Sequence, residues 1–152
     1  MHGVPPMTTT ADRSIPLTDA NKALVRRFVQ EIFAEGRIGS IEELVAPAFT
    51  SSTFGIADDG PARLREATER VHASLDDVEF VIDDLVADGD RVAVRLTASA
   101  TPIGEFMGVK DAAGRHYSIS EAHFFRIADG RVVEHWHLHD AHGLMKQLEP
   151  AL

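Results

Sequence analysis

The stretch VEFVIDDLVADGDRVAVRLTASA, residues 78–100, decides the fold class. Apolar and polar residues alternate on both sides of Asp88-Gly89-Asp90, which predicts two antiparallel strands joined by a tight turn. The same pattern returns in residues 115–128 and 131–139, on either side of Asp129-Gly130. The sequence therefore predicts about four long antiparallel strands in its C-terminal part.

The residues before this stretch have helical periodicity instead. A helix is predicted over residues 20–35, capped by Thr18-Asp19 and ended by Gly36. Its buried face is expected to contain Val25, Phe28, Val29, Ile32 and Phe33. Residues 40–43 have capping-box spacing and predict a short helix that ends before Pro47. A third helix begins near Pro61, and its inner stripe is expected to contain Leu64, Thr68, Val71 and Leu75.

A short helix over residues 141–148 completes the order of elements. Three helices followed by antiparallel strands predict an α+β fold, in which a curved antiparallel sheet wraps on about three N-terminal helices as a cone or barrel. Such a sheet encloses an apolar cavity, where ligands usually bind. We expect residues 1–17, rich in proline and threonine, to be a flexible leader and residues 18–152 to form a single domain.

Composition narrows the class of protein. The 152 residues carry a net charge of −9, so a nucleic-acid partner is not expected. There is no cysteine, which excludes disulfides and zinc–thiolate sites and fits a cytoplasmic location. No apolar run approaches the ~18 residues of a membrane span, and residues 1–17 lack the pattern of a secretory signal, so no membrane partner is expected.

The order of elements, together with four short stretches, resembles the SnoaL-like polyketide cyclase family, whose fold is the nuclear-transport-factor-like cone. The stretches are the run at 20–35, GEFMGV at 104–109, DGRVVEHW at 129–136, and Asp140 followed by GLMKQL. The resemblance covers roughly residues 20–149. It implies a cavity enzyme that acts on aromatic polyketides.

The chain departs from the family pattern at several positions. Thr101-Pro102 stands where members often have a Thr-His pair, and KDAAG replaces a Pro-Thr-Gly turn. The serines of FTSSTF replace an early histidine. His137 follows the tryptophan where the family usually has an aspartate. If that aspartate is the acid–base residue, this chain has exchanged it for an imidazole.

The stretch EHWHLHDAH, residues 134–142, is the strongest candidate for chemistry. Strand alternation puts Trp136, Leu138 and Asp140 on one face and His135, His137 and His139 on the other. The large apolar groups favour the tryptophan face as the interior. Asp140 would then be a carboxylate beside an apolar cavity, with the raised pKa that a general acid or base requires. The alternative is that Asp140 only caps the last helix.

The hairpin partner adds Glu121 and His123 to this site. If Ala128 pairs with Arg131 across the turn, His123 lies opposite Trp136 and converges with Glu121 and Asp140. A bulge at Gly130 would instead place His123 opposite His137, so His137 stays a candidate as well. We therefore predict Asp140, His123, Glu121 and His137 as catalytic residues, and Trp136, Phe106, Phe28 and Leu138 as substrate-binding residues.

The remaining histidines have simpler explanations. His135 and His139 are expected on the outward face, solvated or at a dimer interface, and His72 and His116 are expected to be solvated. A metal site is the rival interpretation, because His-x-His on a strand places two imidazoles together. Three histidines in a row along an extended strand are too far apart for one ion, so a metal would need two of them and ligands from elsewhere in the chain. The favoured prediction contains no metal site.

The resemblance implies the reaction class. Relatives close polyketide rings or hydroxylate them, and a histidine with a carboxylate in a dry pocket needs no cofactor. Departures from the cyclase pattern favour cofactor-free hydroxylation of an anthracycline-type polyketide, with reducing equivalents from the substrate or a separate reductase. The alternatives are an aldol cyclase and a non-catalytic ligand-binding or assembly module. A homodimer through the sheet faces is also expected.

Overall fold

The computed structural model describes residues 16–52 and 60–150. Most of the proposed leader, residues 1–15, lies outside them, as does part of the FTSSTF stretch. The chain follows the predicted order of helices and then strands, with one further strand. Within the described residues there are four α-helices and five strands: α1 (Leu17–Arg27), α2 (Ile41–Leu44), β1 (Val45–Ser51), α3 (Gly60–Ser74), β2 (Leu75–Asp88), β3 (Arg91–Pro102), β4 (Tyr117–Ala128), β5 (Arg131–His139) and α4 (Ala141–Leu148).

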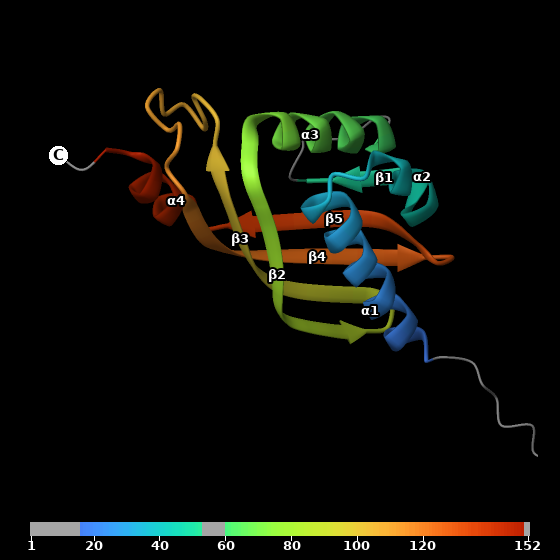
Figure 1. The fold of residues 1–152 in the computed structure, drawn as a ribbon. Coiled ribbons are helices and arrows are strands. Elements are labelled where there is room, and N and C mark those ends of the chain that lie inside the picture. Colours follow the sequence, from blue (N-terminus) through green and yellow to red (C-terminus); the bar gives the residue numbers. More distant parts are fainter. Residues whose placement is uncertain (1–15, 53–59, 151–152) are drawn as a thin grey trace, which may run out of the picture.

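The strands form one open, curved sheet in the order β1-β5-β4-β3-β2 (Figure 1). Neighbours from β2 to β5 are antiparallel, as predicted, whereas β1 joins the edge of β5 in parallel. Register shifts in β2 beside Asp77 and Asp83 are typical of bulges, which bend a strand. Figure 1 shows α1 and α2 towards one end of the curved sheet and α4 at the other. The predicted α+β fold is confirmed.

The first helix changes its hydrogen-bond pattern before it ends. After α1 the chain continues as a π-helix, η1 (Phe28–Ala34), and a 3₁₀ turn, η2 (Ile38–Ser40), precedes α2. Gly36 terminates the helical run with a positive φ of 65°, as predicted, because glycine adopts this conformation without a Cβ clash. The expected caps are absent: neither Thr18-Asp19 nor Ser40 caps a helix, and the Ser40 hydroxyl donates to Glu31 instead.

The core lies between the helices and the concave face of the sheet. Val25, Phe28, Val29 and Ile32 are fully buried, as the helical spacing predicts. Phe28 packs edge-on against Phe125 of β4, with ring centroids 5.1 Å apart. Such burial stabilises the fold by roughly 1.5–3 kcal/mol for each large apolar side chain. None of the described helices has the length and apolar character needed to cross a membrane.

Candidate active site

A β-bulge in β5 determines which side chains face the cavity. Ile127 pairs with Val132 and Arg126 pairs with Glu134, so Val133 is an extra residue. An extra residue reverses the alternation of faces beyond it. Val132 is therefore buried before the bulge, and His135 is buried after it, at 2% exposure.

The bulge corrects the expected register. His123 lies opposite His137, and Trp136 lies opposite Phe124 on the other face. The expectation that His123 faces Trp136 is wrong, and the alternative pairing with His137 is confirmed. Ala128 does pair with Arg131 as predicted, so the slip occurs at Val133 rather than at Gly130.

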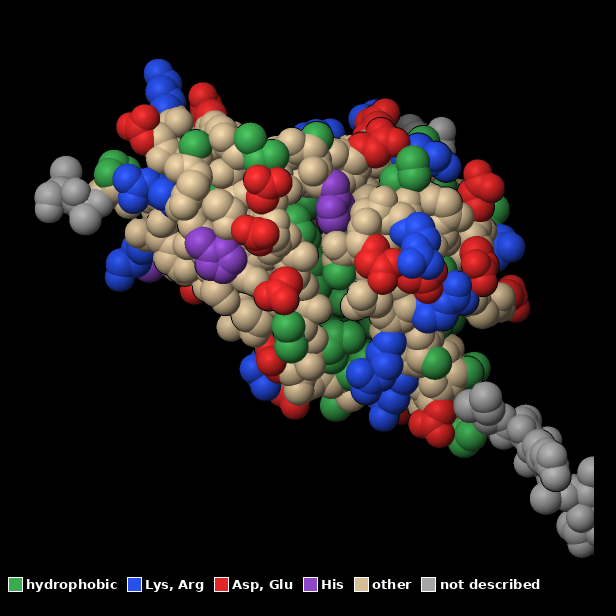
Figure 2. All heavy atoms as spheres, viewed as in Figure 1, with side chains coloured by type: hydrophobic (Ala, Val, Ile, Leu, Met, Phe, Trp, Pro, Cys, Tyr) green, Lys and Arg blue, Asp and Glu red, His purple; other side chains and the backbone are tan. Residues whose placement is uncertain are grey.

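An apolar cavity of about 350 Å³ lies between the concave face of the sheet, η1 and α3. Its walls include Phe33, Leu64, Phe80, Phe106 and Ile119. Figure 2 shows apolar side chains exposed inside a hollow on this side of the molecule. The polar side chains of Glu121, His123, His135, His137 and His139 also line it. The cavity is thus apolar with a small number of polar groups, the usual character of a small-molecule site.

Three of these side chains, Glu121, His123 and His135, form a continuous hydrogen-bonded relay with Ser51, which lies behind the cavity wall. The Ser51 hydroxyl, at the end of β1, lies 2.9 Å from Nδ1 of His135. Nε2 of His135 lies 2.8 Å from Nδ1 of His123, and Nε2 of His123 lies 2.8 Å from Oε1 of Glu121. These short contacts link the edge strand to a carboxylate at the cavity through two buried imidazoles.

The protonation states of Glu121, His123 and His135 follow from their surroundings. Burial disfavours the charged form of Glu121, but the imidazoles of His123 and His137 outweigh this and lower the Glu121 pKa to about 2. Burial also lowers the pKa of His123, against the opposing effect of Glu121. Burial and the neighbouring His123 and His137 lower the pKa of His135 well below its usual value. At neutral pH the carboxylate is therefore ionised and both histidines are neutral.

These states fix the direction of every hydrogen bond in the relay. A carboxylate can only accept, so His123 donates to Glu121 through Nε2–H and accepts at Nδ1. His135 must then donate through Nε2–H to His123, which leaves its own Nδ1 to accept from the Ser51 hydroxyl. All three hydrogen bonds therefore donate in the same direction along the relay, which ends at the Glu121 carboxylate.

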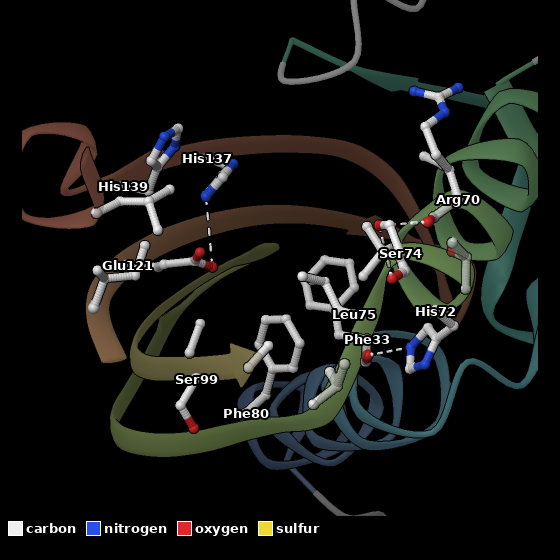
Figure 3. A pocket seen from close by; sticks show the side chains of 18 of the residues that line it. Phe33, Arg70, His72, Ser74, Leu75, Phe80, Ser99, Glu121, His137 and His139 are labelled. Carbon is white, nitrogen blue, oxygen red and sulfur yellow. Dashed lines mark hydrogen bonds and ion pairs between the residues drawn. The ribbon is translucent and has the colours of Figure 1, made fainter. Parts of the chain in front are cut away.

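His137 and His139 continue the row of imidazoles toward the cavity opening. Figure 3 shows His137 directed at Glu121, and Nε2 of His137 lies 3.5 Å from its Oε1. This Nε2 is buried and has no hydrogen-bond partner in the described part of the chain. The His137 ring stacks between His123 at 4.4 Å and His139 at 5.1 Å. His137 is thus an imidazole in the cavity with one nitrogen near an ionised carboxylate, the pairing used in general acid–base catalysis.

The ligand atoms of Glu121, His123 and His137 also lie within 4.8 Å of one another, close enough to consider a metal. An imidazole binds a metal along its nitrogen lone pair, in the plane of the ring. The His123 and His137 rings are stacked at an interplanar angle of only 15°, so their lone pairs run side by side rather than converging. One ring would have to rotate before both could bind one ion. The arrangement as it stands suits proton transfer.

The structure places four predicted site residues outside the cavity, namely Trp136, Leu138, Asp140 and Phe28. Trp136 lies on the outer face beneath the Arg91 guanidinium, 5.7 Å away, and Leu138 is 69% exposed. Both are on this face because the bulge reversed the alternation. Asp140 is exposed and caps α4, with its Oδ1 accepting from the Gly143 amide at 2.9 Å. The predicted tryptophan-lined interior is therefore wrong, and the capping interpretation of Asp140 fits the geometry.

Other predicted residues keep a place at the site. Glu121, His123 and His137 line the cavity together, as does Phe106. Phe28 is fully buried in the core and does not line it.

Sequence reasoning missed His135, His139 and His72 as parts of this cavity, and Ser51 as the hydrogen-bond partner of His135. The histidines 135 and 139 were expected to face outward, and the bulge turns them inward. His72 was expected to be solvated, but it lines the cavity and its Nε2 lies 2.9 Å from the Phe33 carbonyl oxygen. Ser51 gave no local signal, because it meets His135 only through the non-local pairing of β1 with β5.

Comparison with known proteins is consistent with this cavity fold. The model of the SnoaL-like polyketide cyclase family matches residues 23–148. The chain therefore belongs to the SnoaL-like polyketide cyclase family. A comparison with curated protein sequences gave no match.

Three similar solved structures come from Streptomyces, and each is 28% identical in sequence. TsrD from Streptomyces laurentii has a TM-score of 0.77 over 86% of this chain and 95% of its own. AclR from Streptomyces galilaeus, a proposed hydroxylase, has a TM-score of 0.71 over 86% and 96%. Wild-type IdmH from Streptomyces antibioticus, a proposed polyketide cyclase, has a TM-score of 0.71 over 84% and 97%. The identity to a proposed hydroxylase equals that to a proposed cyclase, so the reaction has to be argued from the site.

Proposed function

We propose that this protein is a tailoring enzyme of aromatic polyketide biosynthesis that removes a proton from a flat substrate held in the cavity. One observation carries the proposal: the relay from Ser51 to Glu121 ends beside His137, inside an apolar pocket. A carboxylate beside an imidazole stabilises the imidazolium that forms when the ring accepts a proton. His137 is therefore the proton acceptor, and Glu121 stabilises its charged form.

The position of His137 supports this assignment independently. It occupies the place where the resemblance expects an aspartate, and it faces the cavity while Asp140 does not. We propose that the His137 imidazole is the base at this place, because histidine is the side chain most often used in general acid–base catalysis. The stack of rings ends at His139, which is exposed and offers its outer face to a flat aromatic substrate.

The proposed overall reaction is ring hydroxylation. Deprotonation of a phenolic or hydroquinone-like ring gives an electron-rich anion that reacts with O2. Conversion of a ring C–H to C–OH and water consumes one O2, two electrons and two protons. The electrons come from a hydroquinone form of the substrate or from a separate reductase. The resemblance of this chain to AclR, a proposed hydroxylase, supports this branch.

Aldol ring closure is the second candidate. It is favoured by the description of the family model and by the similarity to IdmH, a proposed cyclase. It starts with the same deprotonation, at a carbon beside a carbonyl, and consumes no O2. Uptake of oxygen therefore separates the two reactions.

Anthrone is a suitable first probe, because it is flat, tricyclic and has an acidic CH2 group. Deprotonation is followed as exchange of this group in D2O by NMR, and oxidation is followed with an oxygen electrode, since anthrone plus O2 gives anthraquinone plus water. We expect the wild type to accelerate exchange and Glu121→Gln to lower the rate by roughly 10²–10⁴-fold. Glu134→Gln removes a carboxylate from the outer face and should leave the rate unchanged.

Two outcomes would contradict the proposal. Exchange no faster than in buffer would exclude deprotonation of this substrate class. Full activity of Glu121→Gln would show that the relay does not serve the reaction. Acceleration of exchange without oxygen uptake would favour ring closure over hydroxylation.

A further inference from the structure

Tyr117 is a polar residue of the cavity that the proposed deprotonation does not use. It is the first residue of β4, is only 7% exposed, and lines the cavity. Its ring stacks on Phe106, with centroids 5.9 Å apart and an interplanar angle of 9°. Across the described residues, its hydroxyl makes no hydrogen bond with another side chain or the backbone. The hydroxyl itself is not fully buried, so a ligand in the cavity can reach it and supply the partner.

The inward row of β4 shows where this hydroxyl lies relative to the acid–base group. Tyr117, Ile119, Glu121 and His123 alternate along one face, with an apolar residue between the phenol and the carboxylate. Four residues of strand separate the backbones of Tyr117 and Glu121 by about 14 Å. The two polar groups thus stand at separate places along one wall, and the apolar side chain of Ile119 lies between them.

The phenol is available only as a hydrogen-bond donor or neutral acceptor. Burial, together with the nearby charge of Glu121, raises the Tyr117 pKa to about 12, so it keeps its proton at neutral pH. The stack on Phe106 restricts rotation of the ring and holds the hydroxyl in place. A fixed, protonated hydroxyl in an apolar wall recognises an acceptor such as a carbonyl or quinone oxygen.

We infer that the Tyr117 hydroxyl binds a carbonyl oxygen of the flat substrate at a point remote from the group that loses its proton. The inference rests on the proposed function, because that function defines the other end of the substrate. Two-point binding fixes which edge of a symmetric ring system reaches His137. Tyr117 therefore determines orientation and selects quinone-type or ketone-bearing ring systems over hydrocarbons of the same shape.

A matched pair of ligands tests this inference. Anthraquinone and anthracene have the same ring framework, but only anthraquinone carries carbonyl oxygens. Affinities are measured by equilibrium dialysis with ligand absorbance, because the single tryptophan lies on the outer face and does not report on the cavity. The variants are Tyr117→Phe, which removes one hydroxyl, and Ser120→Ala, which removes a hydroxyl from an exposed position on the same strand.

We expect Tyr117→Phe to weaken anthraquinone binding by about fivefold, the usual contribution of one neutral hydrogen bond, and to leave anthracene binding within twofold. Ser120→Ala should change neither affinity. Equal loss of both ligands in Tyr117→Phe would assign the residue a packing role and overturn the inference, as would unchanged binding of both. In either case the substrate class would stand. Failure of the wild type to bind either ligand would instead overturn the proposed substrate class, and the inference with it.

Discussion

His123 on β4 lies directly opposite His137 on β5, and their rings stack with centroids 4.4 Å apart. Both rings reach the same carboxylate oxygen of Glu121, at 2.8 Å and 3.5 Å. One ring is held by a hydrogen bond at each nitrogen, whereas the other has an unbonded Nε2 among the described residues. The pair thus combines a fixed imidazole with one whose Nε2–H faces the carboxylate, which leaves its Nδ1 to accept a proton.

Ser51, at the end of the relay farthest from Glu121, should affect the reaction rate although it does not contact the substrate. Ser51→Ala removes the hydroxyl that donates to His135, so the relay loses its first donor. We expect the free energy of unfolding to fall by about 1–3 kcal/mol, as for other losses of a buried hydrogen-bond partner. The rate of anthrone exchange should fall by about tenfold, with anthraquinone affinity unchanged, because the substrate site is not altered. Rates and affinities are compared with those of Ser52→Ala, which alters an exposed neighbour.

Stability should decrease as the pH falls below the ordinary histidine pKa of about 6.5. Burial lowers the pKa of both His123 and His135 in the folded state, so below pH 6.5 the unfolded chain binds more protons than the folded one. Each such histidine contributes a slope of up to about 1.4 kcal/mol per pH unit. Urea unfolding between about pH 7.5 and about pH 5.5 measures this slope.

The assignment of that slope to buried imidazoles has its own check. His135→Gln should reduce the slope, whereas His142→Gln, at an exposed position of α4, should preserve it. An identical slope in the wild type and His135→Gln would show that the buried pair does not titrate as described.

The π-helical end of the first helix should tolerate no side chain at Gly36. A Cβ atom there would lie 2.7 Å from the His72 ring, and the positive φ adds strain of about 1–3 kcal/mol. Displacing His72 would also disturb its contact with the Phe33 carbonyl. We expect Gly36→Ala to lower both the thermal midpoint and the exchange rate. Gly39→Ala, which meets no atom within 4 Å, should stay within about 0.5 kcal/mol of the wild type.

The outer face of the sheet should form a homodimer. Phe124 and Leu138 are 44% and 69% exposed there, beside the partly buried Trp136. Exposed apolar side chains that cluster on a sheet mark an interaction surface. Light scattering should give a dimer mass for the wild type and a monomer mass for the double variant Phe124→Ser/Leu138→Glu. Leu17→Ser, at an exposed position at the start of α1 and away from the sheet, should remain dimeric. A monomeric wild type would refute the proposal.

Local patterns were sufficient to predict most of the fold. Alternation predicted β2 to β5, and helical spacing predicted the buried residues of α1, because both patterns report directly on which side chains leave water. Strand β1 was missed because Pro47 suggested only the end of a helix, and its pairing with β5 is contact between distant parts of the chain.

The candidate site was predicted only in part, for a specific physical reason. Glu121 and His123 are on a regular strand, so their shared face followed from spacing. The residues of β5 that face the site come after a bulge at Val133. Valine is common in regular strands, so its presence does not indicate a bulge. Because the bulge shifts the register by one residue, the face of β5 that was expected to lie inside lies outside. The roles expected for Trp136 and His135 are exchanged as a result.

Because of the bulge at Val133, the number of residues in β5 decides which of its side chains line the cavity. One face of β5 carries the imidazoles, and the other carries tryptophan and leucine. The register with β4 decides which of these faces points into the cavity. A single deletion at this position, with no substitution anywhere, would present the apolar lining to the ligand. For protein engineering, insertions and deletions in this hairpin are therefore a route between a reactive pocket and a purely binding one.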